Sequence, residues 1–312
     1  MPPAFERRDF KPSDDAQRVR LAPDGERLAY TRLTGVHLHE KLVVPARGWQ
    51  PEEIRWSPDG KHIAYHVAGG PPPGGARAIA WASAMGEAGR VDGIAYTWDP
   101  SGASFTFVNV ARLMVGRVAL SDGKPQRLTK INDDGDPHFP PRLAVSPDGA
   151  RLAFTSRNVR ENVTQVWVLE AAGPKLLTKV PGADAHVLPF WAPTGDTLAL
   201  FVVHLGHEKT ALILVTGGEN EVVYQNPLLD GVVMPAWSPS GRSIAFQRTL
   251  RASHAFTKSG AAQLSLFDGA TRTVTPLCEP GETPGEPRFL DERRLAVDGG
   301  ASATLLTFAE PL

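Results

Sequence analysis

A ten-residue phrase that returns along the chain constrains the fold more than any other feature. One copy reads WSPDGKHIAY and begins at Trp56. Pro58 fixes its own φ, and Asp59 and Gly60 tolerate positive φ, so the middle of the phrase is a tight reversal. The apolar side chains that follow recur at every second residue, which is the period of a strand. Each copy therefore predicts a β-hairpin.

Six clear copies and one eroded copy are spread over the chain. The eroded copy, FLDERRLAV, keeps the aromatic residue and the apolar strand but lacks Pro and Gly. Successive copies begin 35 to 52 residues apart, a spacing that suits one four-stranded sheet per repeat, and no long helical periodicity lies between them. The copies are LAPDGERLAY (21–30), WSPDGKHIAY (56–65), WDPSGASFTF (98–107), VSPDGARLAF (145–154), WAPTGDTLAL (191–200), WSPSGRSIAF (237–246) and FLDERRLAV (289–297).

These repeats predict an all-β fold, a seven-bladed β-propeller of four-stranded antiparallel blades that forms a single domain over 1–312. Six blades are the alternative if the eroded copy at 289–297 does not form its own sheet. After that copy the chain has room for only one further strand, 303–312. We therefore expect the N-terminal stretch AFERRDF (4–10) to supply the missing outer strand and close the ring.

Recurring small and aromatic residues are predicted to pack the blades together. A small residue recurs at the centre of the second strand of the repeats, where it lets neighbouring sheets approach, and a tryptophan recurs just before the turn. We expect both sets to be core residues. They are Ala29, Ala64, Ala153, Ala199 and Ala245, with Trp56, Trp98, Trp191 and Trp237.

Composition excludes several classes of protein. Lys and Arg total 33 against 34 Asp and Glu, so no global charge favours nucleic acid or an anionic membrane as a partner. No apolar run approaches the roughly 20 residues that span a bilayer, and the first residues hold no apolar core of a secretory signal. Cys278 is the one cysteine, so no internal disulfide forms. These features predict a cytoplasmic protein without nucleic-acid or membrane partners.

The repeat phrase and the strands ending in QRLT (126–129) and KLLT (175–178) resemble the TolB-like repeats. Similar repeats form the propeller domains of prolyl-oligopeptidase and acylaminoacyl-peptidase relatives. The resemblance implies the propeller fold over nearly the whole chain, and implies docking, gating or occasional catalysis as its use. The chain departs from the peptidases because it contains no G-x-S-x-G nucleophile elbow, which argues against serine hydrolysis.

One face of the predicted propeller gathers polar loops. We letter the strands of each repeat A to D from the centre outwards. The A–B and C–D turns then share one face, and the longer B–C and D–A connections share the other. Eight of the nine histidines, all but His62, map to the second face, and every D–A connection holds an acid, among them Glu52, Glu53 and Glu286. This face is the predicted binding face.

The candidate site lies where the third to sixth repeats meet this face. DPHF (136–139) and DAHV (184–187) pair Asp with His at corresponding positions, and histidines and arginines of the B–C connections adjoin them. No cofactor follows from a motif, but imidazoles and carboxylates suit a divalent metal. The predicted ligand-binding residues are Asp136, His138, Arg157, Asp184, His186 and Arg248, and the candidate metal ligands are His138, His186, His204, His207 and His254.

Two functions remain open. The first is a binding propeller whose His/Asp/Arg-rich face of the central funnel takes a polar small molecule, a peptide or a protein partner. The alternative is an enzyme that uses the funnel for metal-dependent lyase or hydrolase chemistry, and a minor third option is a propeller that serves a separately encoded peptidase. We favour binding because no compact motif such as H-E-x-x-H supports catalysis.

Overall fold

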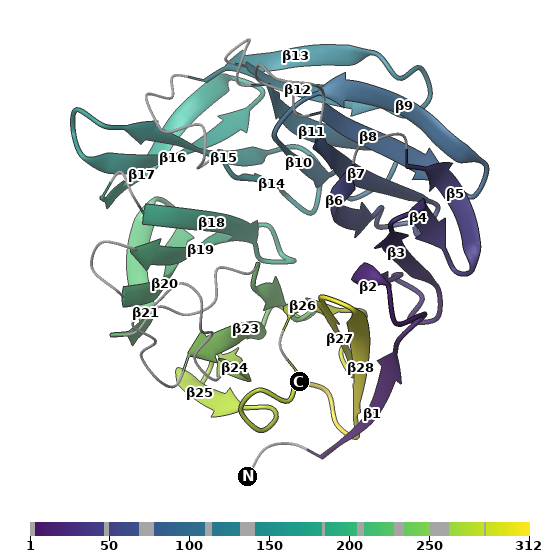
Figure 1. The fold of residues 1–312 in the computed structure, drawn as a ribbon. Helices are drawn as coiled ribbons and strands as arrows, with labels where there is room; N and C mark the ends of the chain where they lie inside the picture. The colour runs from purple at the N-terminus through teal and green to yellow at the C-terminus, as the bar shows by residue number, and fades with distance from the viewer. Residues whose placement is uncertain are drawn as a thin grey trace.

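The strands of the computed structural model form seven four-stranded antiparallel sheets, arranged in a ring (Figure 1). The structure describes residues 4–46, 50–68, 78–109, 114–131, 141–182, 185–204, 209–227, 234–249, 262–283 and 285–312. In these ranges the chain forms strands and turns, and it contains no helix that could cross a membrane. The all-β, seven-bladed prediction is confirmed, and the six-bladed alternative is wrong because the eroded repeat builds its own sheet.

Each of the first four blades consists of four consecutive strands, with the first innermost in the ring. Blade 1 comprises β2 (Gln17–Leu21), β3 (Leu28–Arg32), β4 (Gly35–Leu38) and β5 (Lys41–Pro45). Blade 2 comprises β6 (Gln50–Trp56), β7 (His62–Ala68), β8 (Ala78–Ser83) and β9 (Gly86–Asp92). Blade 3 comprises β10 (Ala95–Trp98), β11 (Ser104–Asn109), β12 (Met114–Ala119) and β13 (Pro125–Lys130). Blade 4 comprises β14 (Leu143–Val145), β15 (Leu152–Asn158), β16 (Val163–Glu170) and β17 (Gly173–Pro181).

The remaining three blades complete the ring, and only the last departs from sequence order. Blade 5 comprises β18 (Ala185–Trp191), β19 (Thr197–His204), β20 (Lys209–Thr216) and β21 (Glu219–Asn226). Blade 6 comprises β22 (Ala236–Trp237), β23 (Ser243–Thr249), β24 (Ala262–Asp268) and β25 (Thr273–Pro276). Blade 7 comprises β26 (Glu286–Phe289), β27 (Arg294–Gly299), β28 (Ser302–Phe308) and the N-terminal β1 (Phe5–Phe10).

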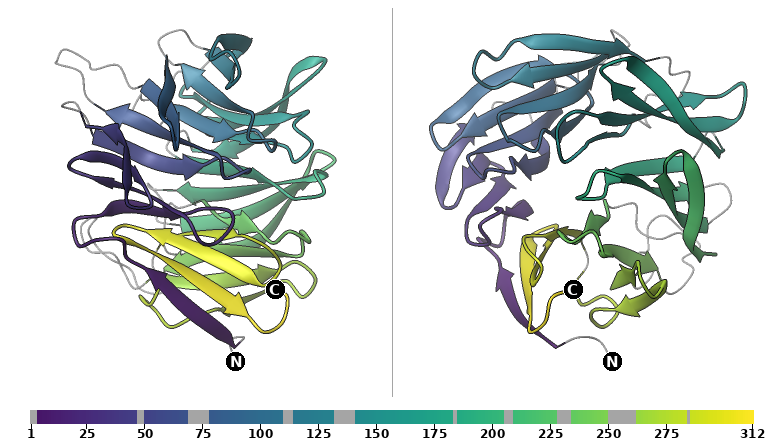
Figure 2. Two further views of the ribbon diagram at one scale, coloured as in Figure 1. Left: turned by 90° about the vertical axis from the view of Figure 1, so that its right-hand side faces the viewer. Right: turned by 180° about the vertical axis from the view of Figure 1, so that it is seen from behind.

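The first strand of the chain closes the ring, as the sequence predicts. β1 pairs antiparallel with β28, in a register that runs from Phe5 opposite Phe308 to Phe10 opposite Ala303. The first and last strands of the chain therefore lie side by side (Figure 2). The ladder covers the outer edge of blade 7, which would otherwise present unpaired backbone groups.

The apolar core lies between the blades. Each buried cluster joins side chains of two adjacent blades, so every blade depends on both of its neighbours for burial. The predicted small residues lie in these interfaces and are fully buried. They are Ala29, Ala64, Ala153, Ala199 and Ala245.

The recurring tryptophans also join adjacent blades, by a contact that the sequence did not reveal. Each indole Nε1 donates to a backbone oxygen on or beside the innermost strand of the preceding blade. The four bonds run from Trp56 to Arg20 (3.2 Å), Trp98 to Arg55 (3.3 Å), Trp191 to Ala144 (3.1 Å) and Trp237 to Phe190 (3.3 Å). The repeat uses tryptophan because its indole ring packs in the interface while its N–H donates a hydrogen bond to the preceding blade.

The repeated turn works as its residues predict. Gly60 has φ of 65°, and its backbone nitrogen donates to the Ser57 carbonyl at 2.9 Å. The Asp59 carboxylate accepts from Ser57 Oγ at 2.6 Å and from the backbone nitrogen of Lys61 at 3.1 Å.

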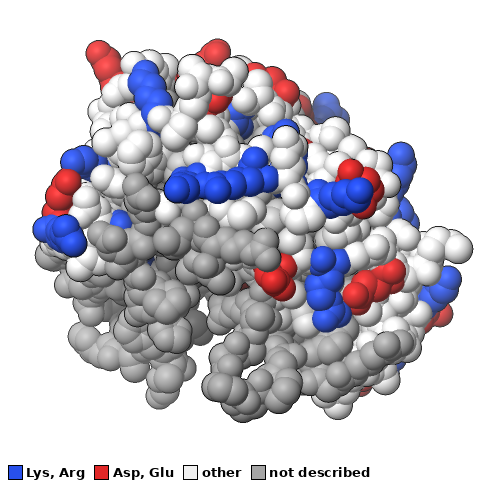
Figure 3. Space-filling view, turned by 90° about the horizontal axis from the view of Figure 1, so that it is seen from above, with Lys and Arg blue, Asp and Glu red and all other residues white. Residues whose placement is uncertain are grey.

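Seen from above the view of Figure 1, acidic and basic side chains are interspersed over the described part of the surface (Figure 3).

Candidate ligand-binding site in the central channel

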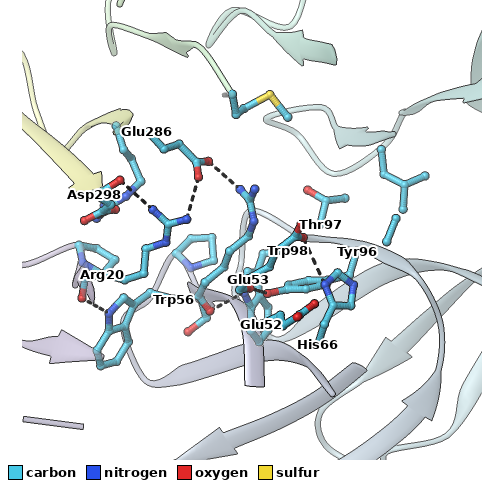
Figure 4. Close-up of a pocket in the computed structure, with 18 of the residues that line it drawn as sticks. Arg20, Glu52, Glu53, Trp56, His66, Tyr96, Thr97, Trp98, Glu286 and Asp298 are labelled. Carbon is cyan, nitrogen blue, oxygen red and sulfur yellow. Dashed lines mark hydrogen bonds and ion pairs between the residues drawn. The ribbon is translucent and has the colours of Figure 1, made fainter. Parts of the chain in front are cut away.

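A cavity of about 620 Å3 lies at the centre of the ring. Its wall is built mainly from the innermost strands β2, β6, β10 and β26, with contributions from β7, β27 and the residues that precede β14 and β22. Figure 4 shows charged side chains from several of these strands converging on it. We call this cavity the central channel.

Three arginines reach the central channel from the same repeat position. Arg20, Arg55 and Arg288 each stand immediately before the first residue of the repeat phrase, in blades 1, 2 and 7. Those blades are consecutive around the ring because blade 7 closes on blade 1. The repeat therefore brings guanidiniums that are distant in sequence onto one wall.

Glu286 joins two of these arginines. Arg20 Nη2 lies 3.0 Å from Glu286 Oε2, and Arg55 Nη1 lies 3.0 Å from Glu286 Oε1. Burial acts to raise the pKa of Glu286, but the guanidiniums of Arg55 and Arg20 outweigh it and lower this pKa below its usual range. One carboxylate thus serves two cations.

The third arginine pairs with a buried acid. Arg288 Nη2 lies 3.5 Å from Asp298 Oδ2, and Asp298 Oδ1 accepts from the backbone nitrogen of Leu21 at 2.9 Å. Asp298 is 5% exposed, and burial raises its pKa against the opposing effect of Arg288. The bond between Asp298 and Leu21 attaches blade 7 to blade 1, so the first role of Asp298 is structural.

A carboxylate–imidazole pair forms a second part of the wall. His66 Nδ1 lies 3.2 Å from Glu53 Oε2. The hydrogen bond from His66 is the main reason that the pKa of Glu53 falls from 4.5 to about 2. His66 is 7% exposed, and its Nε2 is buried without a hydrogen-bond partner in the described part of the chain.

Arg142, which precedes β14, has no counter-ion among the residues that the structure describes. Its half-buried guanidinium lines the central channel and forms no hydrogen bond or ion pair with the residues that the structure describes. Burial lowers the pKa of Arg142, while the carboxylates of Glu53 and Glu286 act in the opposite direction. An unpaired cation in such a place is costly unless an anion joins it.

Five of the nine candidate residues from the sequence lie outside the described residues, namely Asp136, His138, Asp184, His207 and His254. The others lie at strand ends on the expected face of the propeller: Arg157 in β15, His186 in β18, His204 at the end of β19 and Arg248 in β23. Whether these candidates bind a ligand stays a prediction.

The two described candidate metal ligands lie on opposite faces of blade 5. His204 is paired with Ala185, so its side chain shares that residue's face, whereas His186 is the next residue along the strand. Among the described residues, no three His, Cys, Asp or Glu side chains gather to hold a metal ion.

The assignment of eight histidines to one face needs a correction. His37 lies within β4, and His39 follows it in the turn to β5, on the opposite face of the propeller from the B–C connections. The turn between β3 and β4 in blade 1 is very short, because β3 ends at Arg32 and β4 begins at Gly35. β4 therefore begins earlier in the sequence than the spacing of the repeats suggests. His37 instead stacks on Tyr30, with ring centroids 5.2 Å apart.

The sequence pattern missed most of the channel wall. Glu52, Glu53 and Glu286 are among the acids of the D–A connections but not among the predicted site residues, and Arg142 is not among them either. An alignment of the repeats on their turns reveals the arginine that precedes the phrase in blades 1, 2 and 7. This shared position relative to the turn is the sequence feature that indicates the arginines of the channel wall.

No family model matches the sequence, and no curated protein matches it. Solved structures do resemble the fold. TolB from Acinetobacter baumannii is 20% identical with a TM-score of 0.54, over 87% of this chain and 64% of TolB. The chain therefore spans less than two thirds of that relative.

Two further structures belong to enzymes. An oligogalacturonate lyase in complex with manganese is 13% identical with a TM-score of 0.62, over 99% of this chain and 97% of the lyase. The Pyrococcus horikoshii acylaminoacyl peptidase is 12% identical with a TM-score of 0.56, over 80% of this chain and 42% of the peptidase. The chain thus has the β-propeller fold that TolB-like proteins and peptidase propeller domains share.

Proposed function

We propose that the protein binds a small molecule or peptide that carries a carboxylate, and that the ligand occupies the central channel. The observation that carries this proposal is Arg142, a half-buried guanidinium on the channel wall without an ion pair in the described chain. A carboxylate is the natural bidentate partner of a guanidinium.

The charges around Arg142 support an anionic ligand. Arg20 and Arg55 share the single carboxylate of Glu286, so this trio carries a formal excess of one positive charge. Arg142 adds a second positive charge, and Glu53 removes one because its partner His66 is formally neutral. Asp298 faces Arg288, and Glu52 faces Arg18 at 3.7 Å, which leaves the wall with a formal excess of one positive charge. A bound carboxylate would offset this excess in a partly desolvated place, where charge pairing is stronger than in water.

The size of the central channel fits a small ligand. Its volume of about 620 Å3 falls within the roughly 300–1,000 Å3 of typical ligand pockets. Trp56, Tyr96 and Trp98 contribute apolar surface beside the charged groups, a mixture suited to sugar rings and to peptide side chains. The name of one structural neighbour, an oligogalacturonate lyase, mentions such an acidic sugar.

Isothermal titration calorimetry tests the proposal with three acidic probes: digalacturonate, citrate and a dipeptide with a free C-terminus. Galactobiose is the neutral counterpart of the first. We expect one acidic probe to bind and its neutral counterpart not to bind. Arg142→Gln should weaken that binding at least about tenfold, whereas Arg8→Gln, which removes an exposed guanidinium on β1, should not. Equal binding of neutral and acidic probes, or no binding by any acid, contradicts the proposal.

The second candidate function is metal-dependent lyase or hydrolase chemistry in the same funnel. The manganese-bound lyase among the structural neighbours favours it, as do the histidines predicted at the rim. Elemental analysis of the purified protein tests it: a stoichiometric transition metal supports catalysis, and a metal-free protein that still binds its probe supports binding alone. A His138→Ala, His186→Ala double variant that folds but loses the metal or the probe would place the site at the rim.

A further inference from the structure

We propose that His66 binds the same carboxylate as Arg142 through its Nε2, as a protonated imidazole, so that one proton is taken up with the ligand. This inference rests on the proposed function and adds to it a second recognition group and a proton linkage. Its basis is the position and environment of His66.

Only one nitrogen of His66 is available to a ligand. Nδ1 faces Glu53 Oε2 at 3.2 Å, and Nε2 has no hydrogen-bond partner in the described part of the chain. The side chain is 9% exposed and lines the central channel together with Arg142. A buried polar atom without a partner is costly, and a ligand that accepts its hydrogen bond would remove that cost.

The ring of His66 is held in one orientation. Tyr96 packs edge-on against it, with ring centroids 5.1 Å apart and an interplanar angle of 73°. Tyr96 Oη lies 2.5 Å from the Glu53 carbonyl and 2.7 Å from the Ala64 carbonyl. These contacts fix Tyr96 to β6 and β7, the strands that carry Glu53 and His66. Figure 4 shows the imidazole beside Tyr96, with a dashed line for its contact with the Glu53 carboxylate. A fixed ring lowers the entropic cost of binding a ligand.

Blade 1 shows that the fold does not need this pair. Arg18 and Glu53 both have left-handed backbones, with φ of 50° and 49°, at matching bulges in β2 and β6. By register, Thr31 takes the place of His66 in blade 1, and its Oγ donates to the Gln17 carbonyl at 3.1 Å. The same backbone thus forms with Arg and Thr. The Glu53–His66 pair is therefore a property of the channel rather than of the repeat.

The charges around His66 come from three elements. Glu52, Glu53 and Arg55 on β6 line this part of the channel, and so does Arg142 before β14. Tyr96 on β10 contributes a neutral phenol, because burial raises its pKa. A bound carboxylate adds one more anion, which moves the balance towards protonation in the range of about pH 5–8 where imidazoles titrate.

Calorimetric titrations of the acidic probe that binds, whether digalacturonate, citrate or the dipeptide, in two buffers with different ionisation enthalpies near pH 7.5 measure the protons taken up. We expect uptake of up to one proton per bound ligand, and an affinity that falls by up to about tenfold per pH unit as pH rises through neutrality. His66→Gln should abolish the uptake and flatten the pH profile. Glu53→Gln should reduce the uptake. His62→Gln, at the other end of β7, should leave it unchanged.

A second variant guards against loss of folding. His66→Thr places in blade 2 the residue that blade 1 already uses at this register. Binding that requires Arg142 but takes up no proton, or uptake that survives both His66 variants, overturns this inference and leaves the proposed function intact. If digalacturonate, citrate and the dipeptide all fail to bind, the proposed function and this inference fall together.

Discussion

Arg55 and Glu286, 231 residues apart in sequence, form an ion pair of 3.0 Å that joins blade 2 to blade 7. Blade 1 lies between these two blades in the ring, and its Arg20 binds the other oxygen of the same carboxylate. Glu286 therefore links three blades where the ring closes.

Removal of the Glu286 charge should destabilise the ring closure. In Glu286→Gln, two guanidiniums in a poorly hydrated wall lose their counter-ion, and we expect the free energy of unfolding to fall by about 3 kcal/mol in urea denaturation. Glu221→Gln is the matched control, because Glu221 pairs with Arg272 at 3.0 Å on the exposed surface of blades 5 and 6. That control should cost less than about 1 kcal/mol. Equal losses in the two variants would contradict the role of Glu286.

The pH dependence of stability should report the Glu53–His66 pair. The pKa of Glu53 is lowered from 4.5 to about 2 in the folded protein, mainly by the hydrogen bond from His66. Its contribution is therefore present above about pH 4.5 and is lost as pH falls towards 2. Because the Glu53 side chain is 55% exposed, solvent screening keeps this contribution to about 1 kcal/mol.

Unfolding free energies of the wild type and Glu53→Gln, measured from about pH 6 to pH 3, check this expectation. The difference between the two proteins should shrink below about pH 4.5, because Glu53 then takes up a proton in the unfolded wild type but stays ionised in the folded protein. A difference that is constant over this range would show that Glu53 acts by packing alone.

The N-terminal strand should be essential to the ring. A deletion of residues 1–11 removes β1, its ladder with β28 and the ring contact of Phe5 with Phe308, whose centroids lie 5.6 Å apart. We expect the free energy of unfolding to fall by about 3–5 kcal/mol and the melting temperature to fall with it. A truncated protein that melts at the wild-type temperature would mean that β1 contributes nothing to closure.

The indole hydrogen bonds between blades should contribute individually. Trp191→Phe keeps an aromatic ring in the interface but removes the donor to the Ala144 carbonyl at 3.1 Å. We expect a loss of about 1 kcal/mol in unfolding free energy, since water can reach this half-buried site. Thermal denaturation measures the effect, and a variant as stable as the wild type would assign tryptophan a packing role only.

The architecture was accessible from the sequence because each blade repeats the same local physics. The turn needs Pro and Gly, the second strand needs a small residue, and the lone last strand needs a partner, so the copies and the unpaired stretch at 4–10 predict the ring and its closure. Even the eroded copy at 289–297 retains enough alternation to build β27.

The channel wall was much harder to predict. Glu286, Arg20 and Arg55 meet only because the ring closes, and nothing in their local sequence indicates the partner. The pairing of Glu53 with His66 depends on a bulge and a left-handed residue inside β6, which strand alternation does not reveal. The sequence instead predicts loop histidines as site residues, because the ability of histidine to bind a metal is evident from the residue type alone.

A crystal structure of the protein grown with the acidic probe that binds in calorimetry tests the central claim most directly. We expect electron density for this probe in the central channel, with one carboxylate within hydrogen-bond distance of the Arg142 guanidinium. Density at the rim formed by 136–139 and 184–187, with the central channel empty, would contradict it.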